Sequence, residues 1–180
     1  MSDLNREDAY YFKILLTSGF RDGYDEWLDG YLEAENPLSD IVLNLSLCGS
    51  DINKTISCLH NYCAEQDFDE SIVCEKLRIF LKDAYNSNRL NKEETVAYMY
   101  RFAVNHCNTV DFNIDSWGSM FYLDDYHSLA EEGIISWESF DFAFLSYLNE
   151  GTPLDSDLIW SKNSRTKPSL FDRIKSIFKK

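Results

Sequence analysis

Positive charge is missing from a long internal part of this sequence. Between Phe102 and Ser161 there are 11 Asp or Glu residues and no Lys or Arg. Proteins that bind nucleic acid neutralise its phosphates with clustered Lys and Arg side chains. The absence therefore argues against direct nucleic-acid binding by the body of the protein.

Proline, glycine and long apolar runs are also scarce. The 180 residues include 3 Pro and 7 Gly, which leaves little room for linkers. No apolar run reaches the length of a membrane span, and the polar stretch 1–8 does not resemble an export signal. We expect a cytoplasmic protein with one acidic domain at 1–160 and a basic linker and tail at 161–180.

The 5 cysteines form neither a disulfide framework nor a CxxC pair, so we expect buried thiols in a reducing compartment. Cys58, His60 and Cys63 come nearest to a zinc site or a Cys–His nucleophile. On a helix, however, His60 and Cys63 lie about 200° and 140° around the axis from Cys58. His106 and Cys107 are adjacent and point apart for the same reason. The sequence favours structural roles for all of them.

Catalytic signatures are absent as well. No Gly-rich phosphate loop, GxSxG elbow, Rossmann fingerprint, EF-hand loop or HExxH motif occurs. Asp124, Asp125 and His127, with Glu131 in reach on a helix, form an acid cluster that could hold a hard cation or transfer a proton. A metal-dependent hydrolase built on them is a lesser alternative. We expect no enzyme, no catalytic residue, no metal and no cofactor.

Apolar residues at helical spacing, by contrast, are abundant. The stretch Asp69–Tyr85 repeats them at intervals of one, three and four, and Cys74 and Ile79 add apolar surface off that stripe. This pattern predicts a central helix with neighbours on several sides. The stripe consists of Ile72, Val73, Leu77, Phe80, Leu81 and Tyr85.

Helix start signals recur along the chain. Asn5 with Asp8, and Asn91 with Glu94, have the spacing of a capping box, and Ser136 is expected to cap the last helix of the body. No apolar alternation typical of a strand persists. The sequence predicts an all-α protein, a single globular array of about eight short helices with a short basic amphipathic C-terminal helix. The last helix of the body is expected to bury Trp137, Phe140, Phe144 and Leu148.

Charge is distributed very unevenly. The chain has 17 Lys or Arg and 31 Asp or Glu, a formal net charge of −14. Unneutralised carboxylates repel one another, so an acidic surface either serves solubility or recognises a basic partner. On the second interpretation, acids and a neighbouring aromatic form the partner-binding residues: Asp22, Asp25, Glu26, Asp29, Asp124, Asp125, Tyr126, Glu131, Glu132 and Glu138.

The C-terminal segment reverses the sign of the charge. Residues 162–180 contain 7 Lys or Arg and a single acid, Asp172. Three interpretations stay open: the segment docks on the acidic body of its own or a neighbouring chain, adheres weakly to an anionic membrane face, or frays. Its candidate membrane-binding or self-docking residues are Leu170, Phe171, Arg173, Ile174, Lys175, Ile177 and Phe178.

A small, acidic, aromatic-rich helical domain of this kind resembles the immunity proteins that bacteria encode beside polymorphic or contact-dependent toxins. The stretch EAENPLSDIVLNLSLCGSD, Glu33 to Asp51, is similar to short helix pairs in such proteins. The resemblance implies stoichiometric binding of one cognate toxin, often by carboxylates that block a nuclease active site, and it carries over no site residue. We therefore expect a non-enzymatic inhibitor of a basic protein. A peripheral membrane or scaffold protein anchored by the C-terminal segment is the alternative, and the oligomeric state stays open.

Overall fold

A computed structural model describes residues 4–34, 37–64, 67–106 and 116–154. Within these ranges the chain forms eight α-helices and no strand, which confirms the predicted all-α fold. The helices are α1 (Arg6–Thr17), α2 (Tyr24–Ala34), α3 (Asp40–Cys48), α4 (Ile52–Ala64), α5 (Glu70–Asn86), α6 (Lys92–His106), α7 (Ser116–Glu131) and α8 (Trp137–Glu150). The proposed tail helix lies outside the described residues.

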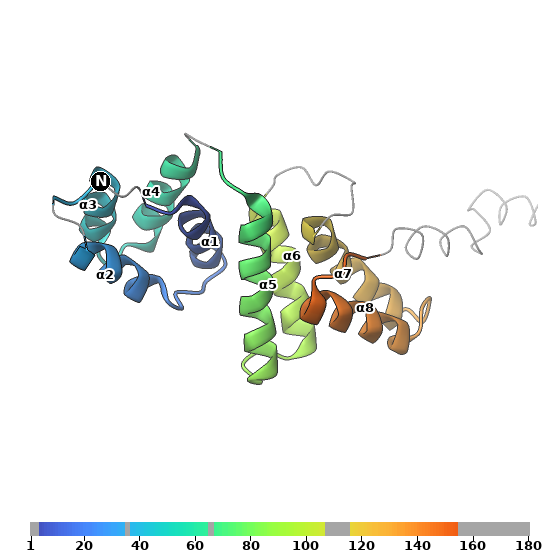
Figure 1. Ribbon diagram of the computed structural model, residues 1–180. Coiled ribbons are helices and arrows are strands. Elements are labelled where there is room, and N and C mark those ends of the chain that lie inside the picture. The colour runs from blue at the N-terminus through green and yellow to red at the C-terminus, as the bar shows by residue number, and fades with distance from the viewer. Residues whose placement is uncertain (1–3, 35–36, 65–66, 107–115, 155–180) are drawn as a thin grey trace, which may run out of the picture.

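The helices are arranged in three groups along the molecule. Helices α1 to α4 pack together on one side, α5 and α6 lie next to each other in the middle, and α7 and α8 complete the other side (Figure 1). Helix α1 contacts both α5 and α6, whereas α5 also contacts α7 and α8. The prediction that residues 69–85 form a central helix with several neighbours is confirmed.

Local side-chain caps fix where several helices begin. The Asn5 side chain accepts a hydrogen bond from the Asp8 amide at 2.7 Å and thereby caps α1. Asn91 and Glu94 exchange side-chain to backbone hydrogen bonds of 2.9 and 2.8 Å, as a complete capping box does. The Ser136 hydroxyl accepts from the Ser139 amide and caps α8. These predicted start signals are confirmed.

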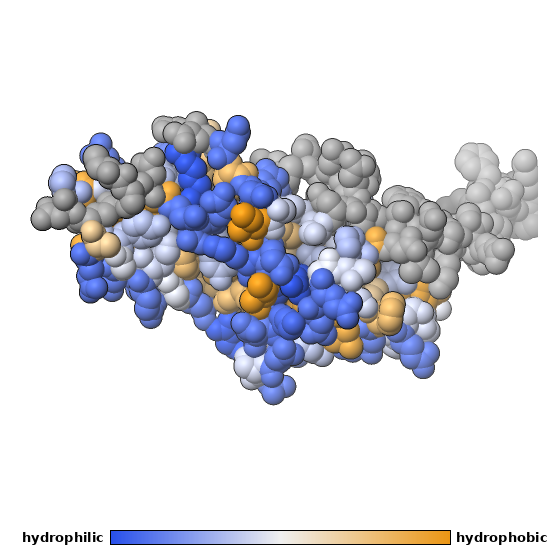
Figure 2. Space-filling model, viewed as in Figure 1, coloured by the Kyte–Doolittle hydropathy of each residue, from blue (hydrophilic) through white to orange (hydrophobic). Residues whose placement is uncertain are grey.

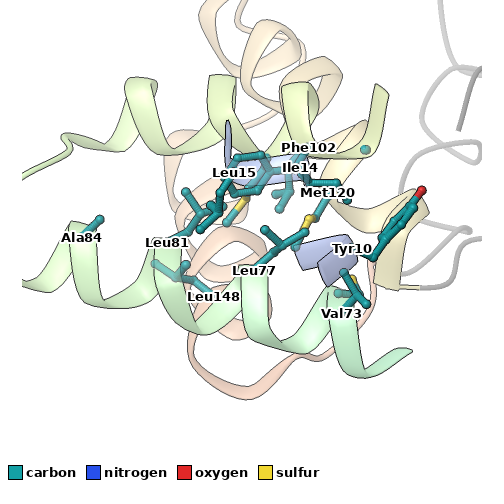
Figure 3. Close-up of a cluster of buried hydrophobic side chains, with 14 of the residues drawn as sticks. Tyr10, Ile14, Leu15, Val73, Leu77, Leu81, Ala84, Phe102, Met120 and Leu148 are labelled. Carbon is teal, nitrogen blue, oxygen red and sulfur yellow. The ribbon is translucent and has the colours of Figure 1, made fainter. Parts of the chain in front are cut away.

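The core is built around one face of α5. Val73, Leu77 and Leu81 have no exposed surface, and they meet side chains from α1, α6, α7 and α8 (Figure 3). Ile72, predicted on the same stripe, is instead 44% exposed. Ile72 lies about 100° around the helix axis from Val73, on the side away from the core, so helical spacing alone overestimated its burial.

Trp137 was also predicted to be buried, and this prediction is wrong. Its side chain is 46% exposed because it occupies the first position of α8, at the edge of the core. Phe140, Phe144 and Leu148 are buried as predicted, and Tyr147 joins them with no exposed surface. The first turn of α8 therefore presents an aromatic side chain at the surface.

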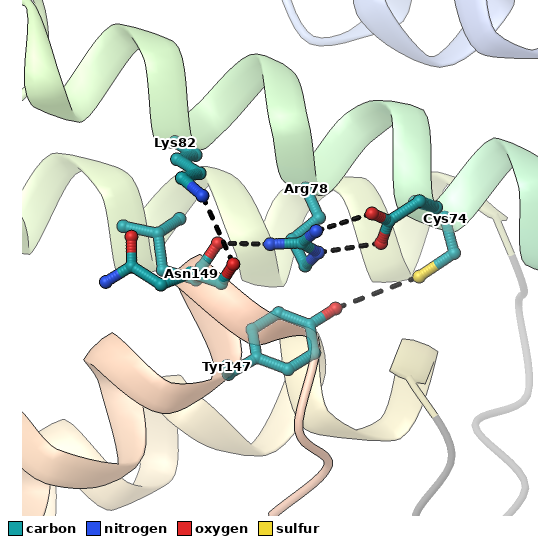
Figure 4. A network of polar contacts seen from close by, with 7 residues as sticks. Cys74, Arg78, Lys82, Tyr147 and Asn149 are labelled. Atoms are coloured by element: carbon teal, nitrogen blue, oxygen red, sulfur yellow. Dashed lines mark hydrogen bonds and ion pairs between the residues drawn. The ribbon is translucent and has the colours of Figure 1, made fainter.

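A buried arginine fastens α5 to the C-terminal end of α8. Arg78 is 7% exposed, donates from Nη1 to the Leu148 carbonyl and forms an ion pair with Glu75 (Figure 4). One turn later, Lys82 donates to the Asn149 carbonyl at 3.2 Å. Both cations thus bind carbonyls at the negative end of the α8 dipole. Gly151 ends α8 with a φ of 70°, and a Cβ there would lie 3.3 Å from Arg78 Nε.

Candidate functional site

Helix α7 carries its acids on the side that faces away from the core. Residues seven positions apart lie on the same face of a helix. Asp124 and Glu131 therefore share one face of α7, and Asp125 shares a face with Glu132, the residue that directly follows the helix. Asp124 is half-buried, and the other three are exposed. The opposite side of α7 is buried and consists chiefly of Tyr122, Leu123, Tyr126 and Ala130.

Tyr126 was predicted to contact a partner, and the structure corrects this. Its side chain is 2% exposed and packs beside Phe140, with 6.4 Å between the ring centroids. Tyr126 follows Leu123 by three residues and precedes Ala130 by four, a spacing that could have identified it as a core residue. The aromatic residue that does reach the surface beside these acids is Trp137.

The start of α8 adds apolar residues to the acidic face of α7. The Trp137 ring contacts His127 on α7, at 5.4 Å between centroids, and Glu138 follows it as an exposed acid in the first turn. Further along α8, Phe142 is 75% exposed. We call this region the α7–α8 surface; it comprises Asp124, Asp125, Glu131, Glu132, Ile134, Trp137, Glu138, Phe142 and Leu145.

The acids of the α7–α8 surface have no lysine or arginine partner in the part of the chain that the structure describes. Among the described residues, Asp124, Asp125, Glu132 and Glu138 form no ion pair, and Glu131 lies 4.0 Å from His127 Nδ1. Burial, together with the charge of Asp124, raises the pKa of Asp125 above its ordinary value. The charge on Asp125 is therefore less favourable in the folded protein than in water.

Replacing Asp125 with asparagine is expected to raise the melting temperature at pH 7. Because the folded-state pKa is raised, the unfavourable effect of the charge is absent below the unfolded pKa of about 3.9 and grows as pH increases through the folded value. Thermal unfolding at pH 7 and pH 3 tests this, with Glu132→Gln as the control for loss of an exposed charge. A gain that persists undiminished at pH 3 would show that charge is not its cause.

The predicted acids on α2 and just before it are exposed but partly neutralised. Asp25 pairs with Arg21 at 2.6 Å, and Asp22 pairs with Arg89 from the loop after α5. Glu26 and Asp29 form no ion pair within the described ranges. The two acidic regions thus differ, since the chain itself supplies counterions for Asp25 on α2 and for Asp22 just before it.

A groove of about 620 Å³ separates α1 and α2 from α5. Two of its three carboxylates have partners, since Lys76 pairs with Asp8 and Arg89 pairs with Asp22, whereas Asp83 forms no ion pair among the described residues. Burial, and then the charge of Asp22, raises the pKa of Tyr11 in its wall to about 12. The sequence analysis missed this groove because it forms between segments about 70 residues apart. Its internal ion pairs make it a weaker attractor of cations than the α7–α8 surface.

The remaining candidate residues do not assemble into a site. Cys63 is buried, Cys58 half-buried and His60 exposed, so they face different directions. In the parts of the chain that the structure describes, no three His, Cys, Asp or Glu side chains come together in a way that could hold a metal ion. His127 packs its ring against Phe140 as well as Trp137.

Apolar residues reach the surface in separate patches over α5 and over α8, with hydrophilic surface around them (Figure 2). No described helix combines the length and apolar character needed to cross a membrane. The candidate tail residues from Leu170 to Phe178 lie outside the described residues. Comparison of the chain with protein-family models, curated proteins and solved structures found no match.

Proposed function

We propose that this protein is a non-catalytic binding protein that inhibits a basic protein partner by covering it with the α7–α8 surface. One observation carries the proposal: acids that have no lysine or arginine partner among the described residues lie near the exposed side chains of Trp137 and Phe142. Opposite charge speeds and orients the encounter between two proteins, and buried aromatic side chains supply much of the binding energy.

Two features make a protein the favoured kind of partner. The exposed apolar side chains would be left in water by a small inorganic cation, but a protein can bury them. The acids extend from Asp124 on α7 to Glu138 on α8, so they match a basic surface better than a single bound ion. A toxin domain is the partner class to test first, because the chain resembles immunity proteins in charge, size and helical layout.

Charge reversal at Glu131, Glu132 and Glu138 is expected to slow association with the partner by about 10- to 100-fold at low salt. The matched control reverses three exposed acids on α2: Glu26, Asp29 and Glu33. Each triple substitution to lysine changes the net charge equally, so the α2 variant should retain binding within about threefold if location matters. Both variants, with the unaltered protein, are used to capture binders from an extract of the native host, and the kinetics are then measured with the purified binder.

The proposal predicts that a basic protein binds both the intact protein and the α2 variant. The α7–α8 variant should not bind it. The association rate of the intact protein with this partner should also fall steeply with ionic strength, since exposed charges are screened beyond about 10 Å at 0.1 M salt. If both variants lost binding equally, the interaction would depend on the total charge of the protein and not on the α7–α8 surface, which would contradict the proposal. An affinity that does not depend on salt would contradict the proposal.

A further inference from the structure

The outer face of α8 presents a short stripe with an acidic end and an apolar middle. Glu138, Phe142 and Leu145 follow one another at intervals of four and three residues, so they lie in line along the helix. Phe142 is 75% exposed and Leu145 is 40% exposed. None of the described residues covers this stripe, so its two apolar side chains are open to an occupant.

The chain itself continues from the far end of the same helix. Leu154 is anchored there, because its side chain is buried and its amide donates to Ser119 Oγ at 2.9 Å. Residues 155–168 then precede the amphipathic segment 169–180. Fully extended, these residues could span roughly 45 Å, and α8 with its 14 residues is only about 21 Å long. The segment can therefore return along the whole of α8.

The segment 169–180 has the pattern that complements this stripe. Phe171, Ile174 and Phe178 recur at intervals of three and four, and Lys179 and Lys180 follow at the end. If the segment runs antiparallel to α8, its last lysines reach the start of that helix. The acids gathered there are Glu131, Glu132 and Glu138. Both the apolar and the charged groups then find partners in one orientation.

We propose that residues 169–180 dock antiparallel on the outer face of α8 of the same chain. Phe171, Ile174 and Phe178 cover Phe142 and Leu145, and the terminal lysines lie beside the acids at the start of α8. The segment is thus an internal competitor that a basic partner of the α7–α8 surface must displace. Docking itself does not depend on any external partner, so it can be tested in the isolated protein and can fail or succeed independently of the proposed function.

Trypsin cleavage of the tail in the full-length protein tests the apolar contact. Replacing Phe142 with serine should raise the rate of cleavage after Arg173 and Lys175 by about threefold or more, because the docked segment loses its main apolar partner. The matched control is Leu47→Ser on α3, since Leu47 is 76% exposed and far from α8 in the sequence. It should leave the rate unchanged. Equal cleavage rates in the unaltered protein and both variants would overturn the proposal.

Zero-length crosslinking with a carbodiimide tests the location and the orientation. Amide bonds from Lys179 and Lys180 should form mainly with Glu131, Glu132 and Glu138, within monomers, and at a yield that does not depend on protein concentration. Glu26 and Asp29 on α2 are equally exposed acids and serve as the internal control. Crosslinks spread evenly over both sets would contradict docking on α8. Crosslinks found only between two chains would overturn the proposal in favour of docking on a second copy. Protection of the tail from trypsin only in the presence of vesicles with anionic lipid would overturn it in favour of a membrane.

Discussion

Replacing Phe140 with alanine is expected to lower the free energy of unfolding by about 3–5 kcal/mol. Phe140 has no exposed surface and is surrounded by aromatic rings from both helices of the site. The centroids of these rings lie 5.9 Å away for Phe144, 5.9 Å for Trp137 and 5.1 Å for His127. Truncation would leave a cavity that neighbours on two packed helices cannot fill. For a chain of this size the melting temperature should fall by roughly 6–20 °C.

Phe142, two residues further along the same helix, provides the matched control. It is 75% exposed, so Phe142→Ala should cost at most about 1 kcal/mol. Urea unfolding of both variants measures the difference directly. Equal losses would mean that the side of α8 assigned to the surface is in fact packed. Because Phe140 also supports Trp137, the Phe140 variant should weaken partner binding even at temperatures where it stays folded.

Much of the fold could be predicted because its signals are local. The capping box of Asn91 and Glu94 involves residues three apart, and so does the Ser136 cap of α8. Helical spacing in the stretch 69–85 likewise identified Leu77 and Leu81 as core residues. These signals depend only on the backbone geometry of one helix, which the sequence encodes within a few residues.

The candidate site was predicted only in part because exposure depends on what packs against each helix. The acids of α7 lie opposite its core face, as expected. Tyr126, which was predicted to contact a partner, is buried, and Trp137, which was predicted to be buried, is exposed. Nor could sequence spacing show that Arg89 neutralises Asp22, from which it is separated by 67 positions. The neutralisation of Asp22 therefore emerges only from a tertiary contact, whereas the pairing of Asp25 with Arg21 is local.

Replacing Arg78 with methionine is expected to lower the free energy of unfolding by about 2–4 kcal/mol. The methionine keeps an unbranched apolar chain in the core, but the Leu148 carbonyl loses its hydrogen bond and Glu75 loses its ion pair. Sequence analysis did not identify Arg78 as a core residue, since charged side chains are rarely buried. The loss should appear as a lower midpoint in urea unfolding at pH 7.

The effect of the Arg78 substitution should also depend on pH. The hydrogen bond from Arg78 lowers the pKa of Glu75 below its ordinary value. A lowered folded-state pKa means that the pair stabilises the fold above the unfolded value, near 4.3, and that this contribution is lost as pH falls through the folded value. The difference between the variant and the unaltered protein should therefore shrink below about pH 4 and level off at the part due to the Leu148 carbonyl.

Lys82 separates the specific role of Arg78 from a general need for cations at the end of α8. It lies one turn further along α5 and donates to the Asn149 carbonyl at 3.2 Å, but its side chain is only half-buried. Lys82→Met should therefore cost less than about 1 kcal/mol, because water can replace the lost donor. Comparable losses at both positions would show that the helix dipole, rather than the buried hydrogen bond of Arg78, holds α8 on α5. In that case salt would weaken the attachment of the helix that carries Trp137 and Glu138, and the salt dependence of partner binding could no longer be assigned to the surface alone.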